Sequence, residues 1–272
     1  MAAEAPAVRD ETVQVWDGRL RLHVKVAGDG PPLVFFHPLS GLAWEPLLLG
    51  QLATRYTVYA PEHPGTSPGE PHAIHQVQTF WELLLVYEEA IRALGLTRPA
   101  VVGQSYGGMV AADLAATFPQ LPSKLVLLSP AGLWRDDAPI PLMEMVAGPP
   151  EDLPGYLFAH PESPVAQAAL ALPADPALIP KAIAQSAWNI GCTTKFAWPI
   201  ADLGLGRRLH RIAAPTLVVW GREDVLIPAV YAEDFGKGIA GSKVEVLEDC
   251  GHVVQVDQPE RTWAAVSTFL AG

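Results

Sequence analysis

The chemistry of this chain is expected to centre on a serine at a sharp strand-to-helix turn. The pentapeptide Gly103-Gln104-Ser105-Tyr106-Gly107 follows the apolar run 99–102 and precedes a helical stretch from Gly108 to Phe118. The terminal glycines allow a turn too tight for side chains beside Ser105, whose own backbone is then strained. Such a turn holds the serine hydroxyl clear of the strand. The pattern therefore predicts a nucleophile elbow.

A carboxylate and a histidine follow in the chain order that such a serine needs. Asp224 comes after the predicted strand 215–220, with Glu223 as its adjacent rival, and His252 comes after the predicted strand 244–247. A serine hydroxyl is a weak nucleophile until an imidazole takes its proton. The imidazole in turn needs a carboxylate to set its tautomer and to stabilise its charged form. We therefore expect the serine, the histidine and Asp224 to act together.

With these motifs the chain resembles the α/β-hydrolase superfamily over nearly its whole length, from about Thr12 to the last helix. The resemblance implies a cap-bearing serine hydrolase of the esterase type. It places a catalytic triad at Ser105, Asp224 and His252. It also implies a mostly parallel central sheet flanked by helices, with a helical cap inserted after the sixth strand.

The resemblance also implies an oxyanion hole made by two backbone N–H groups. One belongs to Tyr106 and the other to the loop that follows the predicted strand 33–36. Many relatives have His-Gly where this chain has His37-Pro38, and proline carries no N–H. We therefore expect Leu39 to supply the second donor.

Short apolar runs alternate with helical patterns, as a parallel sheet with crossover helices requires. The expected strands are 13–16, 20–26, 33–36, 56–60, 100–103 and 125–128, the expected helices are 42–54, 74–94 and 108–118, and Asp17-Gly18 is expected to form a two-residue hairpin turn. Residues 1–130 and 211–272 are expected to form the α/β-hydrolase core.

The alternating pattern breaks between residues 131 and 210, where the chain has eleven prolines and short helical stretches. In the family, a cap occupies this position and covers the carboxyl ends of the strands. We expect the cap to enclose an apolar acyl pocket. The expected pocket residues are Phe158 and Trp188 of the cap, together with His37 and Val253 from the loops around the triad.

Charge and composition narrow the range of partners. The net charge is −11 and no run of four basic residues occurs, so nucleic-acid binding is not expected. The two cysteines are too few for a disulfide framework, and neither a metal site nor a cofactor is expected. The first residues lack the basic and apolar parts of a signal peptide, and no apolar stretch is long enough to cross a membrane. We expect a cytoplasmic protein without a membrane partner, and its oligomeric state stays open.

The expected reaction is hydrolysis of a small, mainly apolar carboxylic ester through an acyl-enzyme. Dehalogenases and epoxide hydrolases of this fold use an aspartate where this chain has Ser105, so both are disfavoured. Carbon–carbon bond hydrolases usually have tryptophan after the histidine, whereas this chain has Val253. They remain an alternative, as do perhydrolases and haloperoxidases with the same triad. An alternative of another class is a ligand receptor that keeps the triad but turns over slowly.

Overall fold

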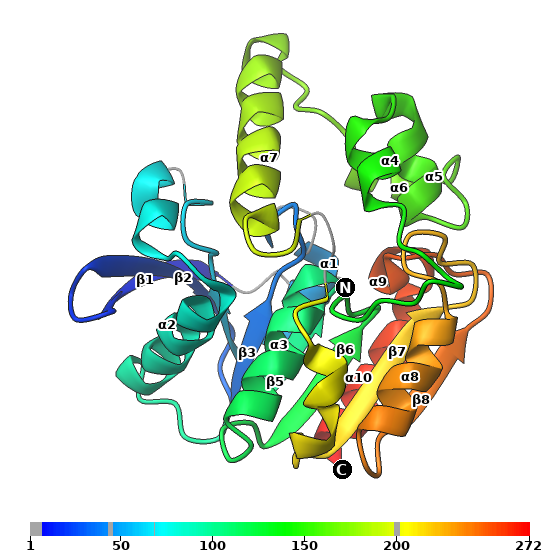
Figure 1. The fold of residues 1–272 in the computed structure, drawn as a ribbon. Coiled ribbons are helices and arrows are strands. Elements are labelled where there is room, and N and C mark those ends of the chain that lie inside the picture. Colours follow the sequence, from blue (N-terminus) through cyan, green and yellow to red (C-terminus); the bar gives the residue numbers. More distant parts are fainter. Residues whose placement is uncertain (1–6, 43–45, 68, 199–201) are drawn as a thin grey trace.

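A single mixed sheet runs through the molecule, as the computed structural model shows for residues 7–42, 46–67, 69–198 and 202–272. These residues form an eight-stranded sheet in the order β1-β2-β4-β3-β5-β6-β7-β8 (Figure 1). The strands are β1 (Val8–Val15), β2 (Leu20–Ala27), β3 (Pro32–Phe36), β4 (Thr57–Pro61), β5 (Ala100–Gln104), β6 (Lys124–Leu128), β7 (Thr216–Gly221) and β8 (Lys243–Leu247). The β1–β2 and β2–β4 pairs are antiparallel, and the other pairs are parallel. The α/β class and the mostly parallel sheet predicted from the sequence are confirmed.

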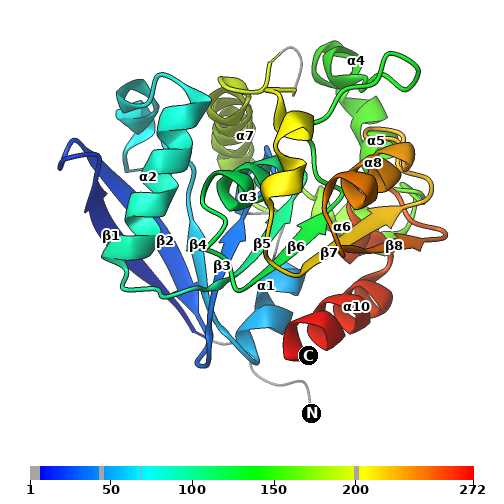
Figure 2. The ribbon, with the colours of Figure 1, turned by 60° about the horizontal axis from the view of Figure 1, so that its bottom comes forward.

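Helices cover both faces of this sheet (Figure 2). One face carries α1 (Pro46–Ala53) and α10 (Pro259–Ala271), and the other carries α2 (Phe80–Ala93), α3 (Tyr106–Thr117) and α8 (Val230–Gly238). Side chains of a strand point alternately to the two faces. In β3, Leu33 and Phe35 accordingly join the core under α1 and α10, while Val34 and Phe36 join the core under α2 and α3.

Three local predictions about element boundaries were wrong. The strand expected over 13–16 runs from Val8 to Val15. The helix expected from residue 74 begins at Phe80, because Thr79 and Glu82 form a capping box that satisfies the first backbone N–H groups. A short 3₁₀ turn, Pro71–Gln76, precedes it. The hairpin turn is longer than two residues, since Val15 pairs with Leu20 across it.

The parallel strands end at one edge of the sheet, where the candidate catalytic loops begin. Phe36 at the end of β3 pairs with Gly103, and Gln104 at the end of β5 pairs with Leu128 at the end of β6. The last residue of β7, Gly221, likewise pairs with the last residue of β8. Loops that follow these strands therefore start side by side, although they are far apart in the sequence.

The segment 131–210 joins β6 to β7, and its α-helices stand beyond this edge of the sheet (Figure 1), whereas its 3₁₀ turn Leu205–Arg207 lies beside α3. Its α-helices are α4 (Leu142–Ala147), α5 (Leu153–Leu157), α6 (Pro164–Ala169) and α7 (Ile179–Thr194). Pro154, Pro164 and Pro180 lie in the first turns of α5, α6 and α7. A proline there sacrifices no helical hydrogen bond, so the prolines begin these helices rather than break them. No helix in the described part of the chain is both long enough and apolar enough to cross a membrane.

Candidate active site

Ser105 lies in a strained turn between β5 and α3. Its φ and ψ are 54° and −117°, a region that residues with a side chain rarely adopt. Neighbouring backbone comes so close that a Cβ atom on Gly103 would lie 2.3 Å from the carbonyl oxygen of Gly107, and one on Gly107 would lie 2.1 Å from that of Phe36. The Ser105 N–H donates to the carbonyl of Leu128 at 2.9 Å, which holds the strained residue against β6. The glycines thus permit a close approach that fixes where the hydroxyl points.

Ser105, His252 and Asp224 form one chain of hydrogen bonds. The distance from Ser105 Oγ to His252 Nε2 is 2.8 Å, and the distance from His252 Nδ1 to Asp224 Oδ2 is 2.9 Å. Because a carboxylate only accepts, Nδ1 carries the proton, which leaves Nε2 free to accept from the serine hydroxyl. All three residues are buried. The structure thus brings together the three side chains that the sequence singled out.

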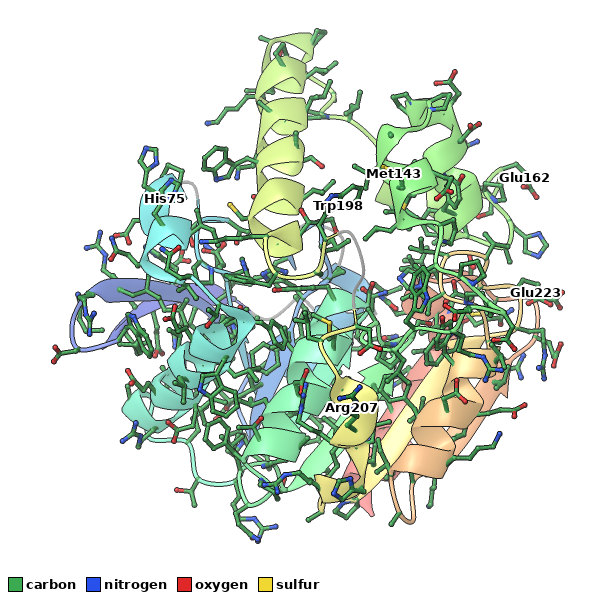
Figure 3. All side chains as sticks on the ribbon, viewed as in Figure 1. His75, Met143, Glu162, Trp198, Arg207 and Glu223 are labelled. Atoms are coloured by element: carbon green, nitrogen blue, oxygen red, sulfur yellow. The ribbon has the colours of Figure 1, made fainter. Side chains whose placement is uncertain are left out.

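The loop after β7 separates Asp224 from its neighbour Glu223. The second carboxylate oxygen of Asp224 accepts from the N–H groups of Leu226 and Ile227 at 3.0 and 2.8 Å, so the carboxylate is held firmly toward the histidine. Glu223 is exposed and lies at the outer edge of the molecule in Figure 3. Its carboxylate accepts from the N–H of Cys250 at 2.9 Å. Glu223 therefore ties two loops together and does not contact the histidine.

The loop after β3 is organised by His37. Its Nδ1 lies 2.7 Å from the carbonyl oxygen of Pro38, and its Nε2 accepts from the N–H of His63 at 2.9 Å. Since a carbonyl only accepts, His37 is the neutral tautomer with the proton on Nδ1. Burial lowers the pKa of His37, which keeps the ring neutral. Among the backbone hydrogen bonds of the described residues, none is donated by the N–H groups of Leu39 or Tyr106.

His63 is a second buried histidine close to this loop. Its Nε2 lies 3.2 Å from the carbonyl oxygen of Cys192 in α7, and its Nδ1 lies 3.2 Å from the hydroxyl of Tyr87. Burial, and secondarily the nearby His37, lowers the pKa of His63 to about 3. A ring that stays neutral and has both nitrogens occupied by protein groups serves to hold α7 against the core. Sequence reasoning missed this role.

A small cavity of about 90 Å³ adjoins the Ser105 and His252 side chains. Its walls are mainly apolar, and the apolar side chains come from both the core and the 131–210 segment: Met145, Leu153, Leu157, Ile190, Leu226 and Val253. Leu39 and Ser40 line it from the loop after β3, and Ser186 lines it from α7. The cavity can receive the apolar part of a small molecule next to the serine hydroxyl.

Of the four expected pocket residues, Val253 lines this cavity, whereas His37, Phe158 and Trp188 are not among the described residues that do. Phe158 is buried where the chain passes the loop before His252, with its backbone against Gly251. Trp188 is 40% exposed and donates its indole N–H to the carbonyl of Gly65 at 2.9 Å.

The helical period explains why Ser186 and Ile190 of α7 line this cavity and Trp188 does not. Each residue of an α-helix turns by about 100°, so Ser186 and Ile190, four positions apart, share a face. That face lines the cavity, and Trp188 lies on another. The spacing was visible in the sequence, but which face turns toward the serine was not.

The family model that matches this chain is described as "Alpha/beta hydrolase family" and covers residues 33–265. The chain belongs to this family. That membership confirms the resemblance inferred from the elbow and the two downstream loops. This membership, together with the lipase and the hydrolase among the relatives described next, supports the conclusion that the protein is a hydrolase.

Two curated relatives illustrate the range of the similarity. The monoacylglycerol lipase abhd6-B of Xenopus laevis is 28% identical over 66% of this chain and 58% of its own length. The 2-hydroxy-6-oxo-6-phenylhexa-2,4-dienoate hydrolase of Comamonas testosteroni is 26% identical over 92% of this chain and 91% of its own length. Among solved structures, a membrane phospholipase A described as a bacterial virulence factor has a TM-score of 0.77 and 25% identity, over 97% of this chain and 86% of that one.

The elbow geometry predicts that Gly107→Ala strongly destabilises the protein. The new methyl group would collide with the backbone of β3, which cannot move without disturbing the sheet. We expect a loss of about 3 kcal/mol in the free energy of unfolding. The matched control is Gly50→Ala in α1, where an added Cβ meets nothing within 4 Å. That change should stabilise by up to ~1 kcal/mol. Urea denaturation measures both, and an unchanged midpoint for Gly107→Ala would contradict the geometry.

Proposed function

We propose that this protein is a serine hydrolase that cleaves a small, mainly apolar carboxylic ester through an acyl-enzyme. The observation that carries the proposal is the buried chain of hydrogen bonds from Ser105 through His252 to Asp224. An exposed histidine near a serine is common, but a buried imidazole with a fixed carboxylate on one side and a strained serine on the other is suited to proton removal.

The mechanism follows from the proton positions. His252 Nε2 takes the hydroxyl proton as Ser105 Oγ attacks the ester carbonyl, and Asp224 stabilises the imidazolium that forms. The oxyanion accepts hydrogen bonds from the N–H groups of Leu39 and Tyr106, each contributing about 3 kcal/mol to lowering the barrier. The imidazolium then gives its proton to the leaving alcohol. Water, deprotonated by the same imidazole, attacks the acyl carbonyl, the bond to Ser105 Oγ breaks, and the imidazolium returns its proton to that oxygen as the acid is released.

We propose further that the segment 131–210 is a cap over a core made of residues 1–130 and 211–272. The cavity beside the serine supports this division, because Met145, Leu153 and Leu157 wall it from one part of the segment and Ile190 from another. A cavity of about 90 Å³ favours a small acyl group.

The Comamonas relative makes carbon–carbon bond hydrolysis the second candidate. The name of that protein indicates a dienoate substrate, which carries a carboxylate. A buried carboxylate needs a cationic partner or several N–H donors. Among the described residues that line the cavity there is no lysine and no arginine. The lining therefore favours the uncharged ester.

The proposal predicts that a fluorophosphonate labels Ser105. The imidazole activates this hydroxyl alone, so intact-mass and peptide mass spectrometry should find one adduct at that residue. Ser105→Ala should abolish both labelling and turnover of a chromogenic ester. The matched control is Ser129→Ala, which changes a buried serine directly after β6 that is not among the residues lining the cavity. An adduct elsewhere would contradict the assignment, and a single stoichiometric burst without turnover would favour the slow receptor.

The two adjacent acids should behave differently. Asp224→Asn should lower kcat by orders of magnitude, since the amide favours the wrong imidazole tautomer. Glu223→Gln should leave kcat within about threefold, because Glu223 contacts the N–H of Cys250 rather than the histidine. Steady-state kinetics on one ester compares the two variants directly. If the two variants exchanged behaviour, Glu223 would be the acid.

Substrate size should follow the small volume of the cavity. Each methylene that fits contributes about 0.8 kcal/mol of burial, so the specificity constant on p-nitrophenyl esters should rise from acetate to a short or medium acyl chain and then fall. Met143, Val165 and Ile183 are 55%, 50% and 54% exposed on the surface of the 131–210 segment. These side chains belong to α4, α6 and α7. A specificity constant that keeps rising through palmitate would mean that these helices separate to admit a lipid, contrary to the proposal.

A further inference from the structure

One face of α7 carries a polar stripe directed at the loop after β3. Gln185, Asn189 and Thr193 are spaced four residues apart, so they share this face of the helix. Thr193 is fully buried and the other two are half-buried. The stripe lies next to the face that lines the cavity, which carries Ser186 and Ile190. The helix thus presents apolar and polar faces to two different parts of the same site.

Two residues of the stripe, Asn189 and Thr193, reach consecutive carbonyl groups of the loop, while Gln185 reaches the carbonyl of Thr66 at 3.4 Å. The Thr193 hydroxyl lies 3.1 Å from the carbonyl oxygen of Leu39, and it also lies 2.9 and 3.1 Å from the carbonyl oxygens of Asn189 and Ile190 in its own helix, between which its single proton is shared. Asn189 Nδ2 lies 3.3 Å from the carbonyl oxygen of Ser40. Gln185 Nε2 donates to Asn189 Oδ1 at 2.8 Å, which turns the asparagine amide so that its N–H₂ group faces the loop. Asn189 also packs close to Gly41, where a Cβ would lie 3.0 Å from Nδ2.

These contacts flank the N–H that the proposed function assigns to the oxyanion. The N–H of Leu39 and the carbonyl of Pro38 belong to one peptide group, and His37 holds that carbonyl at 2.7 Å. The next two carbonyl groups are the ones that α7 holds. The Leu39 peptide group is thus fixed from the core on one side and from α7 on the other. A rotation of the loop would have to break both sets of bonds.

We propose that Asn189 and Thr193 are positioning residues for the oxyanion hole, through which the seating of α7 sets the direction of the Leu39 N–H. The inference rests on the proposed function. A hydrogen bond to an oxyanion acts mainly in the transition state, and its strength depends steeply on geometry. Loss of a tether should therefore lower kcat while leaving substrate affinity nearly unchanged.

Two adjacent threonines provide a matched test. Thr193→Val and Thr194→Val each remove a hydroxyl that contacts carbonyl groups of the preceding turn of α7. The Thr193 hydroxyl also reaches Leu39, so Thr194→Val controls for the loss of the contacts within the helix. Thr193→Val should lower kcat by roughly 10-fold with KM changed by less than about twofold. Thr194→Val should leave both near the parent values. Thr193→Ser, which keeps the hydroxyl, should restore kcat to within about threefold of the parent.

Inhibition by a transition-state analogue distinguishes a role in positioning the oxyanion hole from a general loss of rigidity in the protein. A trifluoromethyl ketone of the tested ester forms a tetrahedral adduct with an oxyanion, while the carboxylic acid product does not. Thr193→Val and Asn189→Ala should weaken inhibition by the ketone by the same factor as they lower kcat, and inhibition by the product should stay constant. Assays are run well below the melting temperature of each variant. Equal losses for ketone and product, or unchanged kcat in both variants, would overturn the inference.

Ser105→Ala, measured alongside, keeps the two proposals distinguishable. If this variant retains turnover, the proposed function itself fails, whatever α7 does. If Ser105→Ala is inactive while the α7 variants keep the parent kcat and ketone affinity, the proposed function stands and the positioning role alone is excluded.

Discussion

The site depends on a close approach of backbone to backbone at the carboxyl edge of the sheet. Gly107 lies so near to the end of β3 that an added Cβ would be 2.1 Å from the Phe36 carbonyl oxygen. Gly221, at the end of β7, is equally near to the loop before His252, with the Gly251 carbonyl oxygen 2.1 Å from its Cβ position. Because no side chain separates these segments, the serine, acid and histidine loops converge within hydrogen-bonding distance.

The helices above this edge are fastened to it by polar contacts. Asp257 accepts from the N–H groups of Gly251 and Ala159 at 2.7 and 2.8 Å, which joins the histidine loop to the chain after α5. The N–H of Val253 adds a bond to the carbonyl of Leu157 at 3.1 Å. On the other side, α7 is held by His63 and by its own polar stripe. Both walls of the cavity are thus attached to the loops that would carry out the reaction.

The fold and the three central residues could be predicted because their signals are local. Alternating apolar residues, a glycine-flanked serine and loops that begin after strands each follow from a few neighbouring residues. The signal for the start of α2 was equally local, because Thr79 and Glu82 form a capping box, but sequence reasoning overlooked it. The catalytic roles of Ser105, Asp224 and His252 stay a prediction until the labelling and mutant kinetics are measured.

By itself, the sequence determined the α/β class, the order of the three residues along the chain and the preference for Asp224 after β7. The tertiary structure alone decided which face of α7 lines the cavity, that Trp188 bonds to Gly65 instead, and that Asn189 reaches the loop after β3. The physical reason is that a helix has several faces compatible with its own sequence. Its rotation is set by contacts with segments more than a hundred residues away, and no local pattern records those contacts.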